Sequence, residues 1–133
     1  NVGRGMKVNK EEIFGMYGAL EHYLQQAHDK EWKDWEARVR LIANAAESVN
    51  GVQTESYVPP IADHTPTLKI FWDTDKIQLS GDGMLEALNN GNPSIVAYGG
   101  GENSITVSPW MMLPGQDKVV AKRIKEELVK ALV

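Results

Sequence analysis

Val52-Gln53-Thr54-Glu55-Ser56-Tyr57-Val58 is the stretch at which the periodicity of the chain changes from that of a helix to that of a strand. Its residues alternate between two faces, a pattern typical of a strand with one face toward a core. Asn50 and Gly51 precede the stretch, and glycine readily takes the left-handed conformation that ends many helices. Prolines follow at 59–60, and proline cannot donate to a strand ladder. The sequence therefore predicts a strand over 52–58 that directly follows a helix.

Toward the N-terminus, the pattern predicts an amphipathic helix and then a second helix or a bent continuation. Asn9 can cap the first helix and Glu12 can complete a capping box. The first helix is expected over Lys10–Ala27, with an apolar stripe of Ile13, Met16, Tyr17, Leu20 and Leu24. A polar run at 28–31 interrupts the stripe, which resumes at Trp32, Trp35, Val39, Ile42, Ala46 and Val49.

Toward the C-terminus, short strands and helices are expected to alternate. The sequence predicts a strand at 67–72, a short helix capped by Ser80, strands at 94–98 and 104–108 joined by a hairpin, and a final helix at 117–132. This order predicts an α+β fold, a small and mostly antiparallel sheet of about four strands with helices on one side.

Composition narrows the class of protein further. The 133 residues, 42% hydrophobic, suit a single domain with a modest core, and the chain has no cysteine for disulfides or thiol chemistry. The net charge of −4 weighs against a nucleic-acid partner, which needs clustered cations. We expect no membrane span and no signal peptide, and we expect a cytoplasmic protein.

Few residues suggest chemistry by their spacing. The histidines at 22, 28 and 64 lack metal-ligand spacing, so no metal site is predicted. The glycines at 99–101 lack the Lys-Ser/Thr of a phosphate loop and are interpreted as a turn. No GxSxG elbow exposes a nucleophilic serine. The sequence therefore assigns no catalytic residue.

Two aromatic or apolar groups have more than one interpretation. Trp32 and Trp35 share a helix face, which indicates a core or an interface with another domain. The run Trp110-Met111-Met112-Leu113 lies between two prolines. It either folds over the sheet edge or contacts protein that lies outside this chain.

Arg4 and Lys7 are the candidate binding residues. Glycines at 3 and 5 let the backbone approach a ligand, and the following helix offers free N–H groups and a positive dipole end. These features suit an anion, although a solvated basic loop explains the two charges equally well. Because the chain opens on this basic loop without an initiator Met, we expect it to be a fragment of a longer protein.

The opening segment, Gly3-Arg4-Gly5-Met6-Lys7-Val8-Asn9-Lys10-Glu11-Glu12-Ile13, resembles a family of pyridoxal-phosphate (PLP) enzymes, the selenocysteine synthase and D-glucosaminate-6-phosphate ammonia-lyase-like family of fold type I. The resemblance continues, in order, through Gly51-Val52, Pro66–Asp73, Leu79-Ser80, Gly91-Asn92-Pro93-Ser94-Ile95 and Met112-Leu113-Pro114-Gly115. It implies that the chain is the family's small C-terminal domain. The expected division is a loop at 1–8, a long or broken helix at 9–50 and an α+β core at 51–133.

The resemblance also implies a function. The family uses PLP as an electron sink for elimination from an amino acid or amino sugar acid. Its Schiff-base lysine lies upstream, so the resemblance implies that this chain alone binds no PLP and is inactive. Arg4 and Lys7 match two basic positions that can hold a phosphate or similar anion. Lys7 stands where bacterial selenocysteine synthases have Arg, and lysine lacks the bidentate geometry of arginine. The Lys form is common in the lyase-like branch of the family, and together with the acidic balance of the chain the resemblance favours a small phosphorylated substrate over a charged tRNA.

The resemblance implies two partners, the missing large PLP domain of the same polypeptide and further copies of the parent in a homo-oligomer. The alternative is a stand-alone binding or oligomerisation module without catalysis. In that case the first helix, the Trp32/Trp35 face and the 110–113 run would bury against a partner.

Overall fold

The computed structural model describes residues 7–61 and 64–133. The chain divides into two compact units, Asn1–Glu31 and Trp32–Val133. The elements are α1 (Lys10–Gln25), α2 (His28–Glu47), β1 (Val52–Tyr57), β2 (Thr67–Trp72), α3 (Gly81–Asn89), β3 (Tyr98–Gly99), β4 (Ser104–Val107) and α4 (Gln116–Lys130). Within the described ranges, no helix is both long enough and apolar enough to cross a membrane.

The first unit contains α1, and its start confirms the predicted capping box. The backbone N–H of Glu12 donates to Asn9 Oδ1 at 2.8 Å, and the N–H of Asn9 donates to Glu12 Oε2 at 3.1 Å. The helix ends at Gln25, slightly before the predicted Ala27. His28 lies against Tyr23, with ring centroids 4.3 Å apart. The cap fixes where α1 begins.

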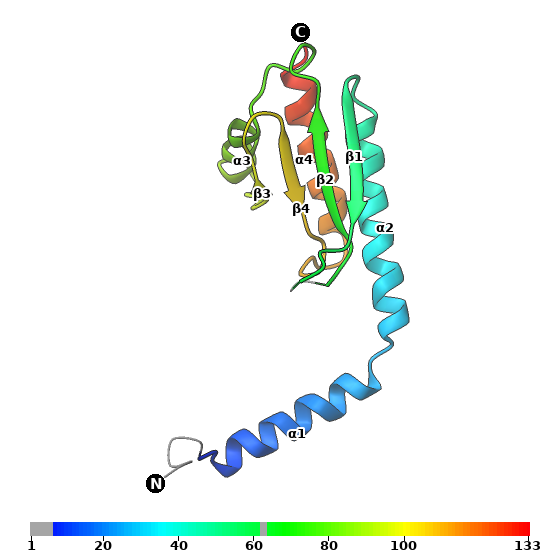
Figure 1. The fold of residues 1–133 in the computed structure, drawn as a ribbon, viewed down its shortest axis with the longest axis vertical. Coiled ribbons are helices and arrows are strands. Elements are labelled where there is room, and N and C mark those ends of the chain that lie inside the picture. The colour runs from blue at the N-terminus through cyan, green and yellow to red at the C-terminus, as the bar shows by residue number, and fades with distance from the viewer. Residues whose placement is uncertain (1–6, 62–63) are drawn as a thin grey trace. The chain divides into compact units, whose positions relative to one another are not determined.

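The second unit is built on a four-stranded sheet in the order β1-β2-β4-β3, with every neighbouring pair antiparallel (Figure 1). In the register, Ile70 of β2 lies between Thr54 of β1 and Ile105 of β4. The α+β class and the mostly antiparallel sheet are confirmed.

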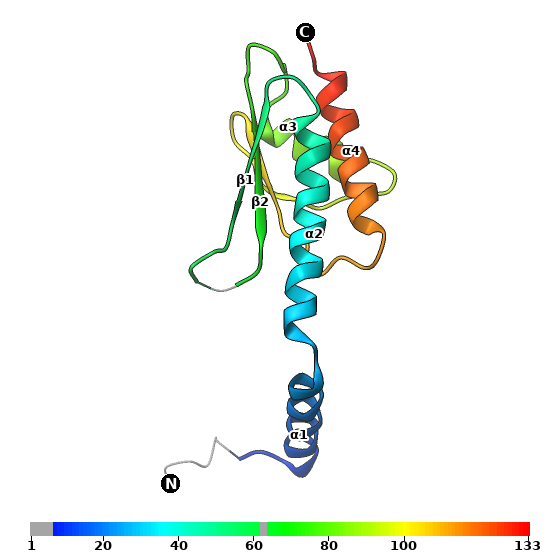
Figure 2. The same ribbon diagram turned by 90° about the vertical axis from the view of Figure 1, so that its right-hand side faces the viewer.

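The helices α2 and α4 lie on one side of this sheet (Figure 2). The alternation along β2 turns Leu68, Ile70 and Trp72 into the core, and each of them is at most 2% exposed. The helices contribute a set of buried aliphatic residues that includes Val39, Ile42, Ala46, Val120, Ile124 and Leu128. Burying one such side chain stabilises the fold by about 1.5–3 kcal/mol relative to leaving it exposed.

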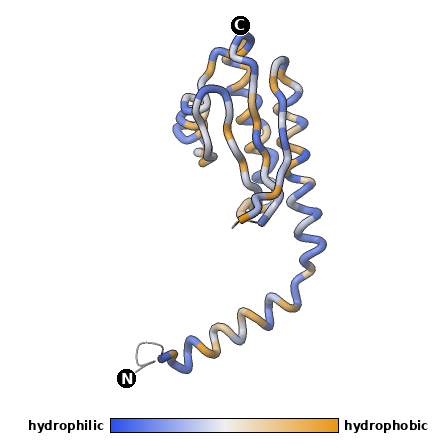
Figure 3. The backbone as a smooth tube through the Cα atoms, viewed as in Figure 1, coloured by the Kyte–Doolittle hydropathy of each residue, from blue (hydrophilic) through white to orange (hydrophobic). Residues whose placement is uncertain are grey.

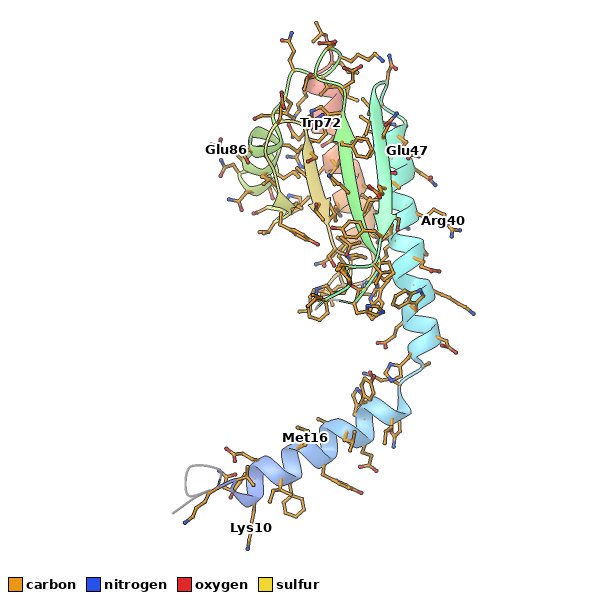
Figure 4. The ribbon with its side chains drawn as sticks, viewed as in Figure 1. Lys10, Met16, Arg40, Glu47, Trp72 and Glu86 are labelled. Carbon is orange, nitrogen blue, oxygen red and sulfur yellow. The ribbon has the colours of Figure 1, made fainter. Side chains whose placement is uncertain are left out.

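Trp72 lies at the end of the sheet that is near the C-terminus of α4 (Figure 4). Its indole N–H donates to the carbonyl oxygen of Leu79 at 2.7 Å, so the buried ring has its polar atom satisfied. Ser80 then caps α3, because its Oγ accepts from the N–H of Gly83 at 3.0 Å. The predicted cap of the short helix is confirmed.

One predicted strand is wrong over most of its length, and two helices differ slightly in extent from the sequence pattern. The strand expected at 94–98 is reduced to Tyr98–Gly99, because the N–H of Ile95 donates to Leu88 O at 3.0 Å and ties that segment to α3 instead. The second helix begins at His28, within the polar run, where acidic residues suit the positive end of a helix. The last helix ends at Lys130, and Leu132 forms a bridge with Ile77.

The glycines at 99–101 form a turn, as predicted. All three have φ between +89° and +104°, a region that favours glycine. Asp82 Oδ1 accepts from the N–H of Gly101 at 3.1 Å, and the N–H of Gly81 donates to Gly101 O at 2.9 Å. The turn therefore closes the β3–β4 hairpin and ties it to the first turn of α3.

Candidate functional site

The predicted anion-binding pair is only partly within the described residues. Arg4 lies outside them. Lys7 is exposed and precedes the N-cap residue Asn9 by two positions, near the positive end of α1. The role of Arg4 and Lys7 therefore stays a prediction.

The apolar stripe of α1 is not buried by any described residue of its own unit. No residue of α1 is buried, and hydrophobic residues recur along the whole helix (Figure 3). Seven large side chains are 52–74% exposed, namely Ile13, Phe14, Met16, Tyr17, Leu20, Tyr23 and Leu24. A 16-residue helix is marginal alone in water, so this stripe needs an apolar surface against it to be stable.

The segment 109–113 is a second apolar surface, and it is held by a residue that sequence reasoning missed. Arg38 Nη1 donates to Met112 O at 2.6 Å and to Pro109 O at 3.3 Å. The N–H of Met112 also donates to Pro109 O at 3.0 Å, which closes a turn. The signal for Arg38 was its place on the buried stripe of α2, three residues after Trp35 and four before Ile42.

This anchored turn presents its side chains outward. Trp110 is 48% exposed, Met111 71% and Leu113 65%, while Met112 packs partly against the core. Folding over the sheet edge thus describes Met112 alone. The other three side chains are free to contact another protein surface, the second of the two interpretations.

A pocket of about 500 Å³ lies beside the turn; we call it the α4 pocket. It is lined by Pro93, Ser94, Ile95, Val96, Ser108, Met111, Met112, Gln116, Val119 and Val120, none of which is ionisable. Segment 93–96, which includes most of the predicted strand 94–98, forms one wall of the pocket. Ser108 Oγ is buried and has no hydrogen-bond partner. The uncharged lining suits an apolar occupant.

Trp32 and Trp35 contact each other within the second unit. Their ring centroids are 6.3 Å apart in an edge-to-face arrangement, and both residues are half-buried. Trp32 Nε1 donates to Glu36 Oε1 at 2.9 Å, and its ring lies 6.2 Å from that of His64. Each tryptophan is therefore only partly covered within the second unit.

His28 lies close to one acidic side chain, with its Nδ1 3.4 Å from Glu31 Oε2. His64 lies beside Trp32, and His28 lies beside Tyr23 in the first unit. Over residues 7–61 and 64–133, no group of three or more histidine or acidic side chains could hold a metal ion.

Comparisons with known proteins gave a structural likeness. Neither the protein-family models nor the curated proteins contain a match to the chain. A solved structure described as "Structure of D-Glucosaminate-6-phosphate Ammonia-lyase" matches with a TM-score of 0.68 and 19% sequence identity over 98% of this chain. The match takes up 35% of the other chain, so this chain spans about a third of its length. At this identity the likeness shows a shared fold.

Proposed function

We propose that this chain is the small C-terminal domain of a PLP-dependent enzyme that resembles the ammonia-lyase. The observation that carries the proposal is the match of its fold to part of that lyase over 98% of its length. The sequence motifs that resemble the same family, from Gly3 to Gly115, add support. The proposed reaction is elimination from a small phosphorylated amino acid or amino sugar acid, with PLP as electron sink.

The described residues do not fit a PLP site of their own. PLP needs a lysine amine for its Schiff base and donors for its phosphate. The α4 pocket has neither a lysine nor an arginine in its lining. Lys76, at another hollow, is paired with Asp73 at 3.4 Å. Cofactor binding would therefore belong to the large domain, and we expect the isolated chain to be inactive.

Within this proposal, α1 is the helix that packs on the large domain. Its apolar face is wide, because Met16 and Tyr23 border the central stripe on one side and Phe14 borders it on the other. A wide face suits the surface of a globular domain better than the narrow seam of a two-helix coiled coil. The matched lyase has about two-thirds of its chain outside the match, enough for such a domain.

Arg4 and Lys7 are proposed to hold the anionic group of the substrate at the junction of the two domains. The test uses the complete enzyme. Changing Lys7 or Arg4 to Ala should raise KM for a phosphorylated substrate about tenfold or more, since each charged hydrogen bond contributes about 1.5–3 kcal/mol. Lys7→Arg should retain binding, and Lys10→Ala, the nearby control, should leave KM unchanged. Equal kinetics for all four variants would contradict this role.

The experiment that tests the enzyme proposal is expression of the parent gene from its own start codon. We expect a longer, coloured protein whose visible absorption changes on borohydride reduction, because the reductant fixes PLP on its lysine. A colourless product of about this chain's length would contradict the proposal.

A colourless product of this length would favour the alternative, a stand-alone binding or oligomerisation module without catalysis. Its support is the exposed stripe of α1, which needs a partner in either case. Selenocysteine synthase-like activity, a homo-oligomeric parent and a cytoplasmic location stay predictions.

A further inference from the structure

The strand β1 forms one edge of the sheet, and its outer side pairs with no described strand. The order β1-β2-β4-β3 leaves β1 with β2 as its single neighbour (Figure 1). The opposite edge, β3, is two residues long, whereas β1 has six residues and contains neither proline nor lysine. Proteins protect exposed edges with such residues or cover them, because an open edge pairs readily with another strand. β1 therefore has the features of an edge that further protein covers.

The backbone hydrogen bonds show which groups of β1 point outward. The N–H of Asp73 donates to Gly51 O at 2.9 Å, and in the register that continues this pair, positions 53, 55 and 57 lie opposite 71, 69 and 67 of β2. The direction of bonding alternates along a strand, so these odd-numbered positions bond to β2. The N–H and C=O groups of Thr54 and Ser56 then point away from β2. No described residue bonds to these four groups.

A groove of about 300 Å³ lies beside the four outward groups; we call it the β1 groove. Thr54 and Ser56 line it from β1, and Val39 and Ala43 line it from α2. Residues paired across two strands place their side chains on the same face of the sheet. A strand added beside β1 would therefore place a side chain in this groove. Open main-chain groups with a side-chain pocket beside them are the two parts of recognition by strand addition.

The small size of this site favours a tethered strand as its occupant. Four backbone hydrogen bonds and one small side chain contribute too little to offset the freedom of motion that separate molecules lose on association. A segment of the same polypeptide has already lost most of that freedom, and its effective concentration is on the order of millimolar. The matched lyase has about two-thirds of its chain outside the match, so a parent of that kind has enough length to supply the strand.

We propose that an extended segment of the parent polypeptide, outside these 133 residues, adds a fifth strand to the sheet at β1. Its backbone bonds to Thr54 and Ser56, and one of its small apolar side chains enters the β1 groove against Val39 and Ala43. This inference rests on the proposed function only in that it requires a longer parent.

The test is amide hydrogen exchange, resolved to single residues by mass spectrometry, of the 133-residue chain and of the parent expressed from its own start codon. In the 133-residue chain, the N–H groups of Thr54 and Ser56 should exchange fast, because they point away from β2. In the parent they should exchange at least about tenfold more slowly. The N–H of Glu55 is the internal reference, since it bonds to β2 in both proteins.

Matched variants of the parent test whether the β1 groove holds the added strand. Ala43 lines the groove, whereas Ala37 is exposed on the same helix and does not line it. Ala43→Lys should restore fast exchange at Thr54 and Ser56, because the longer side chain fills the groove. Ala37→Lys should leave their exchange rates within about twofold. Circular dichroism shows whether each variant is folded.

A second variant tests the backbone pairing directly. Ser56→Pro removes an outward N–H and no hydrogen bond to β2, and proline is tolerated on an edge strand in this orientation. In the parent it should speed exchange at Thr54 at least about tenfold, because the added strand loses a bond. Unchanged protection of Thr54 in both Ser56→Pro and Ala43→Lys would overturn the strand addition.

The outcomes separate this inference from the enzyme proposal. Fast exchange of Thr54 and Ser56 in a long, coloured parent would overturn the strand addition and leave the enzyme proposal standing. A long, colourless parent in which both amides are protected would support the added strand and contradict the enzyme. A product of about this chain's length would contradict both. Slow exchange in the 133-residue chain that becomes fast on dilution would identify a second copy as the occupant and overturn the inference.

Discussion

Arg38 Nη1 donates to the carbonyl oxygen of Met112 across 74 positions of sequence, at 2.6 Å. This hydrogen bond joins the middle of α2 to the segment that leads from β4 into α4. It also determines which side chains of 109–113 face outward, because it holds the backbone of the turn against the helix. The exposed surface around Trp110 thus depends on a residue that precedes all four strands in the sequence.

Arg38→Ala should destabilise the second unit by about 1.5–3 kcal/mol, since two part-buried hydrogen bonds from a charged group are lost. Urea denaturation measures the change through a lower midpoint at constant slope. Arg40→Ala is the matched control, because Arg40 is exposed on the outer side of α2 (Figure 4) and should change stability by less than about 0.5 kcal/mol. Equal midpoints for the two variants would show that the hydrogen bonds to 109–112 contribute nothing.

Gly100→Ala should destabilise the fold more than Gly101→Ala. Both residues have positive φ, +104° and +92°, so alanine at either costs about 1–2 kcal/mol of backbone strain. At Gly100 the added methyl group would also collide with the Asp82 carboxylate, whereas no atom lies within 4 Å at Gly101. Thermal or urea unfolding of the two variants gives the comparison. A Gly101→Ala variant at least as damaging as Gly100→Ala would contradict this account.

Replacing Gly15 and Gly18 by alanine should raise the helix content of α1 in the isolated chain. Neither position has an atom within 4 Å of an added methyl group, and each change favours the helix by about 1 kcal/mol. Backbone carbon chemical shifts of residues 10–25 measure the effect without interference from the second unit. Unchanged shifts would mean that α1 is already fully helical by itself.

Glu127→Gln should destabilise the chain by about 1–3 kcal/mol. Glu127 Oε1 lies 2.9 Å from Arg123 Nη2, and the two side chains are only 11% and 15% exposed. Glu126 also contacts Arg123, at 3.1 Å, but its side chain is 39% exposed, so water screens this pair more. Glu126→Gln is therefore the control and should cost less than about 1 kcal/mol in the same urea titration. A larger loss of stability in Glu126→Gln than in Glu127→Gln would show that burial does not set the strength of these ion pairs.

Local sequence signals predicted the parts of the fold that depend on neighbours in sequence. The capping box at Asn9 and the cap at Ser80 were correct because each needs residues only three positions apart. The strand at 67–72 was correct to the residue, since β-favouring residues end at the polar Asp73.

The errors occurred where contacts between residues far apart in the sequence determine the structure. Ser94–Tyr98 has the composition of a strand, but the hydrogen bond from Ile95 to Leu88 on α3 prevents most of it from pairing with β4. The anchoring role of Arg38 was missed for the same reason, because no local pattern shows where its carbonyl partners will lie. Arg4, half of the predicted anion site, falls outside the described residues, so that site rests on the motif alone.

The bridge between Leu132 and Ile77 places the last residues beside the segment that follows β2. The N–H of Val133 donates to Lys76 O at 3.1 Å, and the N–H of Gln78 donates to Ala131 O at 2.8 Å. Ile77, which these contacts cover, has no exposed surface. Removal of residues 131–133 from this chain would therefore break these backbone hydrogen bonds and uncover Ile77. A tag fused directly after Val133 therefore needs a flexible spacer that leaves these hydrogen bonds intact.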